Sequence, residues 1–305
     1  MAIAAQTSLS QAAAGTDRIT YGAVHLDVID LERSLAFWRD LIGLGELDRA
    51  ADEVRLGVDG RALIVLHPGA QRGPVRGRSG LYHVAVHLPS EAEFARVLAR
   101  VAAAGVAQAP TDHIFSKATY LSDPDGVQLE LTLETPERAG EITVGPGSVT
   151  IRDSDGRLRG MTEALDVRDV LSHLEDRDLD RPLPSGTSVG HLHLHVADLE
   201  ATRRFYTDVI GFQDHTYVPD IGFGDLSAGG RFPHRFAFNV WQGVGAPPSP
   251  PGTAGLRSFE LAVDPGALAA TRGQLDAERH SYELDADSLI TRDPSGNELR
   301  LAERA

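Results

Sequence analysis

Apolar and polar residues follow one another along this chain with two periods, one typical of strands and one of helices. Residues 23–28 and 191–196 alternate apolar and polar side chains, which is the pattern of a half-buried β-strand. An Asp follows each segment, and apolar residues then recur at helical spacing as far as a glycine. Several short segments typical of strands come next. The pattern therefore predicts a strand, a capped amphipathic helix and further strands.

The same order of elements occurs four times, which indicates an internal duplication. The segment 30–43 is repeated as 198–211, and the turn 123–126 returns as 293–296 at almost the same offset. Two weaker copies open with strands and helices at 82–88 and 92–104, and at 258–263 and 266–278. We therefore expect four βαβββ units, at about 20–77, 78–134, 188–247 and 254–303.

The units divide the chain into four parts. We expect a flexible N-terminal tail, a first domain with units 1 and 2, a connector, and a second domain with units 3 and 4, at 1–18, 19–134, 135–188 and 189–305. Within the connector, the sequence predicts a turn at 153–156 and a helix at 166–174. A connector of this length allows unit 3 to be placed freely.

Composition restricts the kind of partner. The formal net charge is -15, whereas nucleic acids and anionic membranes require clustered Lys and Arg, so neither is an expected partner. With 42% hydrophobic and 24% charged residues, the chain is typical of a soluble globular protein. The sequence has no apolar stretch of membrane-spanning length and no signal-peptide pattern, which predicts a cytoplasmic location. Since the chain lacks cysteine, any metal site must use His, Asp or Glu.

Residues suited to metal binding and proton transfer are concentrated in three segments. His83 lies in the strand that opens unit 2. In the strand that opens unit 3, three histidines share one face: His191, His193 and His195. A run in unit 2 adds an imidazole, a phenol and a carboxylate: His113, Tyr120 and Glu130. Two imidazoles and one carboxylate suit a metal such as iron, and acid/base groups remain.

Four such units resemble the vicinal oxygen chelate superfamily, which includes glyoxalases, bleomycin resistance proteins and extradiol dioxygenases; the resemblance covers nearly the whole chain. The run from His113 through Tyr120 and the turn 123–126 to Glu130 resembles the signature of type I extradiol dioxygenases, the catechol 2,3-dioxygenase group. Thr119 departs from it, because the signature prefers an aliphatic residue there. The resemblance implies an α+β fold in which four βαβββ units form two half-open barrels.

In this superfamily a metal lies inside a barrel, held by the first inward residue of strand one and by a carboxylate on the last strand. The resemblance therefore implies the ligands His83, Glu130 and His191, with Fe(II) as the metal and Mn(II) as an ion that the same ligands accept. Units 1 and 4 have Ala23 and Arg300 at the corresponding positions. Unit 2 should then pair with unit 3, and unit 1 with unit 4 in a non-catalytic barrel.

The same resemblance gives roles to other residues. His113 and Tyr120 match the acid/base and hydrogen-bonding positions of the family. His234 matches a histidine that faces bound dioxygen, although the residues before it depart from the family's histidine-rich run, and His193 is expected to line the substrate pocket. The remaining histidines are expected either packed on strands (His25, His87 and His195) or exposed at the surface (His67, His173, His215 and His280).

The resemblance implies an extradiol ring-cleaving dioxygenase. Such an enzyme inserts both atoms of O2 into a catechol-type diol, so the expected partners are a small aromatic diol and O2. Two alternatives stay open. One is a metal-dependent lyase or isomerase of the glyoxalase type, which normally needs a fourth protein ligand that unit 3 lacks. The other is a metal-free protein that binds a small molecule such as an antibiotic. Association into a homo-oligomer also stays open.

Overall fold

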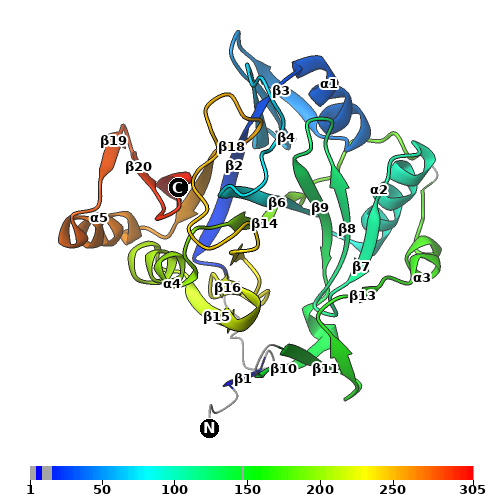
Figure 1. Cartoon of the computed structure of the whole chain (residues 1–305). Helices are drawn as coiled ribbons and strands as arrows, with labels where there is room; N and C mark the ends of the chain where they lie inside the picture. Colours follow the sequence, from blue (N-terminus) through cyan, green and yellow to red (C-terminus); the bar gives the residue numbers. More distant parts are fainter. Residues whose placement is uncertain (1–4, 9–15, 146–147, 177, 305) are drawn as a thin grey trace.

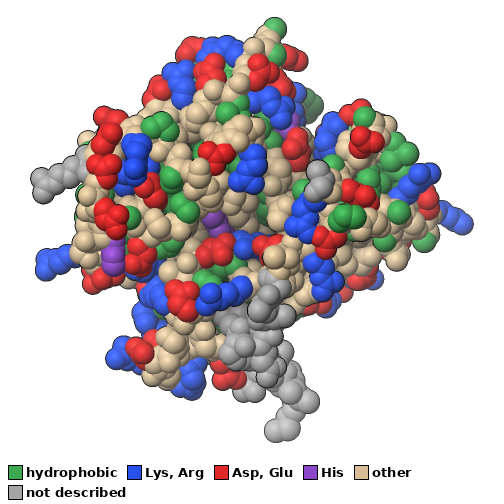
Figure 2. Space-filling view, turned by 180° about the vertical axis from the view of Figure 1, so that it is seen from behind, with side chains coloured by type: hydrophobic (Ala, Val, Ile, Leu, Met, Phe, Trp, Pro, Cys, Tyr) green, Lys and Arg blue, Asp and Glu red, His purple; other side chains and the backbone are tan. Residues whose placement is uncertain are grey.

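The computed structural model describes residues 5–8, 16–145, 148–176 and 178–304. Its strands form two large sheets and one small one (Figure 1). None of the described helices is long and apolar enough to cross a membrane. On the face shown in Figure 2, Lys and Arg side chains lie among Asp and Glu side chains, so the surface charge there is mixed.

The first large sheet joins units 2 and 3. In order across the sheet its strands are β13 (Glu163–Ala164), β7 (Ala109–Asp112), β8 (Ser116–Ser122), β9 (Gln128–Glu134), β6 (Gly80–His87), β14 (Ser188–His195), β17 (Phe236–Asn239), β16 (Phe223–Ser227) and β15 (Gln213–Val218). The two units meet where β6 and β14 run antiparallel, with His83 opposite His193. Two histidine-bearing strands are therefore direct neighbours.

The second large sheet joins units 4 and 1. Its strands, in order, are β19 (Tyr282–Asp285), β20 (Ser288–Arg292), β21 (Glu298–Glu303), β18 (Gly255–Val263), β2 (Ile19–Val28), β5 (Arg61–Pro68), β4 (Val54–Val58) and β3 (Gly45–Arg49). The α+β class and the repeated units are confirmed. The sheets pair unit 2 with unit 3 and unit 1 with unit 4, as the candidate ligand set predicted. The division into sequential domains at 19–134 and 189–305 stays a prediction.

A small third sheet occupies the connector, for which we predicted only a turn and a helix. Its strands are β1 (Ala5–Ser8), β10 (Ala139–Gly145), β11 (Ser148–Asp153) and β12 (Leu158–Gly160), and it lies at one end of the molecule (Figure 1). Strand β1 belongs to the expected tail, of which 1–4 and 9–15 lie outside the described residues. The predicted turn and helix are confirmed, the helix as α3 (Val167–Ser172) with Asp166 as N-cap.

The main helices begin at the residues that the sequence marks as caps. Asp30 and Asp198 accept hydrogen bonds from the first turns of α1 (Leu31–Leu35) and α4 (Leu199–Arg204), and Ser90 does so for α2 (Glu91–Ala103). Helices α1 and α4 continue as π-helices, η2 (Ala36–Leu41) and η4 (Phe205–Ile210). The other helices are α5 (Ala267–Glu278), η3 (Pro136–Arg138) and η5 (Pro219–Ile221).

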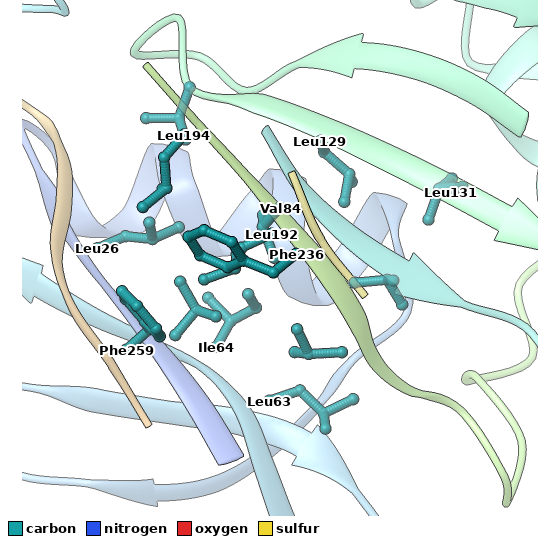
Figure 3. Packing of buried hydrophobic residues seen from close by; sticks show 14 of the residues in the cluster. Leu26, Leu63, Ile64, Val84, Leu129, Leu131, Leu192, Leu194, Phe236 and Phe259 are labelled. Atoms are coloured by element: carbon teal, nitrogen blue, oxygen red, sulfur yellow. The ribbon is translucent and has the colours of Figure 1, made fainter. Parts of the chain in front are cut away.

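One apolar core lies between the two large sheets. Leu26 and Ile64 of the eight-stranded sheet and Leu192 and Phe236 of the nine-stranded sheet belong to the same buried cluster (Figure 3). Because side chains alternate along a strand, the neighbours of these residues point to the opposite face of each sheet. The core therefore holds the sheets together and turns the histidine-bearing faces away from each other.

Two equivalent hydrogen bonds join the sheets at the duplicated turns. Trp38 of η2 donates to Asp123 at 3.3 Å, and Tyr206 of η4 donates to Asp293 at 3.1 Å. Each Asp also accepts from two backbone N–H groups of its own turn. Burial raises the pKa of Asp123 and of Asp293. Each π-helix thus binds the last hairpin of the neighbouring unit through a nearly inaccessible carboxyl group.

Replacing Tyr206 with Phe tests this link. The change removes one donor from the buried carboxyl of Asp293, so the free energy of unfolding should fall by about 1–3 kcal/mol in denaturant titrations. The matched control is Tyr282→Phe, since Tyr282 donates to Asp276 at an exposed site and should change stability by less than about 0.5 kcal/mol. Equal losses in the two variants would contradict the assignment.

Candidate metal centre

Three buried side chains from adjacent strands meet on the outward face of the nine-stranded sheet. His83 lies on β6, Glu130 on β9 and His191 on β14, and each is at most 3% exposed. The Oε2 atom of Glu130 lies 3.0 Å from Nε2 of each histidine, and the two Nε2 atoms are 3.3 Å apart. One oxygen and two nitrogens therefore form a triangle that could hold a single ion.

A further histidine, His87, supports the triangle from the side of His191. Its Nε2 lies 2.9 Å from Nδ1 of His191, and its Nδ1 lies 2.8 Å from Oε1 of Glu134. Arg235 donates to the same oxygen of Glu134 at 2.5 Å. We had expected His87 only to pack on its strand. Its partners come from β9 and β14, so only the pairing of those strands with β6 reveals its position.

The protons in this chain of contacts are too few. Burial lowers the pKa of His87 and of His191, so each ring is neutral and carries one N–H. Burial acts to raise the pKa of Glu134 and of Glu130, but contacts with these histidines hold both pKa values low, at about 2 for Glu134. Both carboxylates only accept hydrogen bonds. Two imidazole protons must therefore serve three contacts.

The missing proton falls between His191 and Glu130. His87 donates from Nδ1 to Glu134, so its Nε2 accepts from Nδ1 of His191, and these partners fix both tautomers. The lone pair of His191 Nε2 then faces Glu130 Oε2 at 3.0 Å. His83 adds another ring nitrogen, and its buried Nδ1 has no hydrogen-bond partner among the described residues. A cation at this point would remove the repulsion, so the donor set fits a metal ion.

His113 and Tyr120, the predicted acid/base pair, are in direct contact beside the triangle. Nε2 of His113 lies 2.8 Å from the Tyr120 hydroxyl, and its Nδ1 donates to the Met161 carbonyl at 2.7 Å. Tyr120 stands opposite Glu130 in the pairing of β8 with β9. Burial, together with the charge of Glu130, raises the pKa of Tyr120 well above its usual value. Tyr120 is therefore a hydrogen-bond donor, with His113 as the acceptor behind it.

A strained residue holds the loop that carries His113. Ile114 has φ of 68°, which is unfavourable for a β-branched side chain, and it is fully buried. Its N–H donates to Asp112 at 2.7 Å, and its carbonyl accepts from Thr135 at 2.9 Å. Arg138 in turn forms two hydrogen bonds with Asp112. Strain of this kind persists where the surroundings enforce it, which is common at functional sites.

His193 lies next to the triangle, with its tautomer fixed by Asn239. Asn239 donates to Nε2 of His193 at 2.7 Å, while its carbonyl oxygen accepts from His195 and from the backbone of Trp241. The ring of His193 lies 4.7 Å from that of Tyr82 and 5.1 Å from that of His83, between centroids. His193 therefore carries its proton on Nδ1, where it can serve as a donor.

His234 approaches His191 from the segment between β16 and β17. The two rings are 4.7 Å apart between centroids, and Nδ1 of His234 lies 2.6 Å from Oδ2 of Asp225. Asp225 also contacts Nδ1 of His215 at 3.0 Å. Although burial acts to raise the pKa of Asp225, these two histidines lower it. Asp225 thus orients His234 as a carboxylate, a role that sequence analysis did not foresee.

Two expectations of surface exposure are wrong. His215 lies on β15 with a side chain only 5% exposed, and His67 lies on β5 and is 6% exposed. Each histidine has a partner from another strand at one ring nitrogen, Asp225 for His215 and His25 for His67. These contacts join residues of different strands, so the local sequence around each histidine does not predict them.

A cavity of about 580 Å³ lies beside the centre, between the two sheets. Tyr82 and His195 line it from the nine-stranded sheet, and Leu256 and Glu298 line it from the other. The three candidate ligands are not part of its lining. Tyr82 thus separates the cavity from His83 and His193, whose rings it contacts.

Gly190 gives His87 the space it occupies, which leads to a test of the support for His191. A Cβ at Gly190 would lie 2.1 Å from ring atoms of His87. Gly190→Ala should therefore displace this ring and weaken Co(II) binding by about 10–100-fold in chelator competition, as loss of a ligand's hydrogen-bond partner does. His87→Ala should act alike, whereas Gly273→Ala, with open space around it, should leave the affinity unchanged. Unaltered affinity in Gly190→Ala would refute the role of His87.

Comparison with known proteins identifies relatives of the chain. Residues 20–131 match the model of the Glyoxalase/Bleomycin resistance protein/Dioxygenase superfamily. A protein of Bacillus subtilis (strain 168) named Catechol-2,3-dioxygenase is 34% identical over 277 residues, which cover 90% of this chain and 93% of that protein.

Two solved structures share the fold. A putative dioxygenase from Bacillus subtilis subsp. subtilis str. 168 has a TM-score of 0.61 at 12% identity, with 95% of this chain and 86% of that chain covered. Glyoxalase I from Zea mays has a TM-score of 0.55 at 14% identity, with 94% and 93% covered. At such identities the likeness concerns the arrangement of the chain and not its reaction.

Proposed function

The chain belongs to the glyoxalase/bleomycin resistance protein/dioxygenase superfamily, and from this premise we propose that it is an extradiol ring-cleaving dioxygenase. Its substrate would be a catechol-type aromatic diol, and its metal Fe(II), held by His83, Glu130 and His191. The observation that carries the proposal is the buried triangle of one carboxylate oxygen and two ring nitrogens, a donor set that fits a metal cation. The relative named Catechol-2,3-dioxygenase supports the same reaction.

The ligand set suits this chemistry. Two imidazoles and one carboxylate on one face leave coordination positions free, and bound Fe(II) would supply a centre at which diol and O2 exchange electrons. The same ligands accept Mn(II). Glu130 keeps its orientation through a hydrogen bond from Thr132 at 2.9 Å, and His191 keeps its own through His87. Neighbouring side chains therefore orient two of the three proposed ligands.

The surrounding residues would bind the diol and move its protons. The oxygen of Tyr120 would accept a hydrogen bond from a substrate hydroxyl, and the proton that the diol loses would pass through Tyr120 to His113, to which Tyr120 donates. His193 offers an N–H toward the ring of the substrate, on the side of Tyr82. His234, whose Nδ1 is held by Asp225 beside His191, would use its other ring nitrogen for proton transfer during the reaction with O2. Each of these residues is a proposed catalytic or substrate-binding group.

The alternative within the family is a metal-dependent lyase or isomerase. The solved structure of glyoxalase I from Zea mays shares the fold. In the part of the chain that the structure describes, however, the cluster at this site comprises His83, Glu130 and His191, without a second carboxylate. A lyase needs no O2, so oxygen consumption distinguishes the two reactions. A metal-free binding protein would bind its small molecule without any ion.

Oxygen uptake with catechol tests the proposed reaction. After anaerobic reconstitution with Fe(II), addition of catechol and air should consume one O2 per catechol and give a yellow ring-opened product. The measurement combines an oxygen electrode with absorbance in the near-ultraviolet and visible. Bound metal without oxygen uptake for catechol or substituted catechols would favour the lyase, and failure to bind metal would favour the binding protein.

Two variants separate metal binding from proton transfer. Glu130→Ala removes a ligand and should lose the iron of this centre, together with oxygen uptake. His113→Ala leaves the ligands intact, so it should keep the iron while turnover falls by about 10²–10⁴-fold. Iron content by atomic emission and initial rates of oxygen uptake provide the readouts. Normal turnover in His113→Ala would show that its assigned role is wrong.

A further inference from the structure

The eight-stranded sheet has its own cluster of imidazoles and carboxylates, and we propose that this cluster is a second metal site that takes a divalent ion of the zinc type. It consists of His25 on β2, His67 on β5, Glu260 on β18 and Glu53 just before β4. This inference does not depend on the proposed function, because it concerns the barrel formed by units 1 and 4.

The four side chains form a continuous chain of contacts. Nε2 of His25 lies 3.1 Å from Oε1 of Glu260, and its Nδ1 lies 2.9 Å from Nε2 of His67. Nδ1 of His67 lies 3.9 Å from Oε2 of Glu53. His25, Glu53 and His67 each offer one ligand atom within 4.8 Å of the others. A small ion could therefore reach two rings and one carboxylate with slight movement of the side chains.

The hydrogen bonds of this cluster leave one ring nitrogen facing a carboxylate. Carboxylates stand at both ends, and two neutral imidazoles have protons for the hydrogen bonds at 3.1 Å and 2.9 Å, whereas the third contact, at 3.9 Å, is too long for a hydrogen bond. If His25 donates to Glu260 and accepts from His67, the remaining nitrogen of His67 presents a lone pair to Glu53. The widest gap in the chain, 3.9 Å, lies at that contact. An extra proton or a metal cation at this point would join the lone pair to the carboxylate.

Burial favours the metal cation over the extra proton. The His67 side chain is 8% exposed, so an extra proton there would place a charged ring away from water, whereas a metal cation binds the neutral ring. Glu53 and Glu260 are 27% and 32% exposed, which leaves a route for a hydrated ion. Arg55 contacts Oε1 of Glu53, while Oε2 faces His67. Two carboxylates would balance a divalent charge.

Comparison of the duplicated units shows that this cluster does not occupy the position equivalent to the first centre. His25 lies opposite Ser258 on β18, as His193 lies opposite His83 on β6. The cluster therefore corresponds to the neighbourhood of His193 and Asn239, one step away from the first centre. A glycine makes the space in both sheets: a Cβ at Gly22 would lie 2.6 Å from Oε2 of Glu260, as one at Gly190 would overlap His87.

Co(II) titration of metal-free full-length protein tests the proposal. The wild-type chain should bind two Co(II) per chain, measured by the d–d absorption and by elemental analysis, with Zn(II) displacing both. His67→Gln and Glu53→Gln should each bind one, and so should Glu130→Ala, which loses the first centre. The matched control is His173→Gln, since it alters an exposed His173–Glu91 pair and should still bind two.

The outcomes are separable from the fate of the proposed function. One ion in the wild type, lost in Glu130→Ala, would overturn the second site and leave the dioxygenase proposal standing. Two ions in Glu53→Gln would also overturn it; this residue is partly exposed and precedes its strand, so a folded variant is expected, and circular dichroism verifies it. Two Co(II) in the wild type, with no oxygen uptake by the protein reconstituted with Fe(II), would support the second site and contradict the dioxygenase proposal.

Discussion

A shortage of protons among buried acceptors is the constraint on which the structure of the centre depends. Glu134, His87, His191 and Glu130 stand in line, and two neutral rings must serve three contacts. An extra proton on a ring or a water molecule could each supply the missing donor, but burial disfavours an imidazolium and keeps water away. A metal cation can instead bind the acceptors that lack a proton. This requirement explains why so many polar side chains occupy the middle of a sheet whose other face packs in an apolar core.

The rest of the fold keeps these groups in register. The common core fixes the two sheets back to back, and the aromatic donors Trp38 and Tyr206 hold the duplicated turns at Asp123 and Asp293. Stability and chemistry thus use different faces of the same strands. At the edge of the centre, the enforced conformation of Ile114 shows that some stability is given up for the position of the loop.

Much of the fold follows from local signals in the sequence, whereas the contacts of the centre do not. Asp30, Ser90 and Asp198 mark helix starts because a cap acts within a single turn, and alternation identifies the strands. Resemblance to a family supplied the set His83, Glu130 and His191, which the structure brings together. The support by His87, the burial of His67 and His215, and the strands of the connector depend on pairing between distant segments, so local patterns could not reveal them.

The order of strands along the chain has a consequence for biosynthesis. The first centre takes ligands from β6 and β9, which precede the connector, and from β14, which follows it. A nascent chain therefore cannot assemble the centre until β14 has left the ribosome. In the proposed second site, three of four groups, His25, Glu53 and His67, emerge at the start of translation. Nascent protein would thus meet cellular metals in two stages, and the ion of the first centre would bind only after β14 has been synthesised and paired.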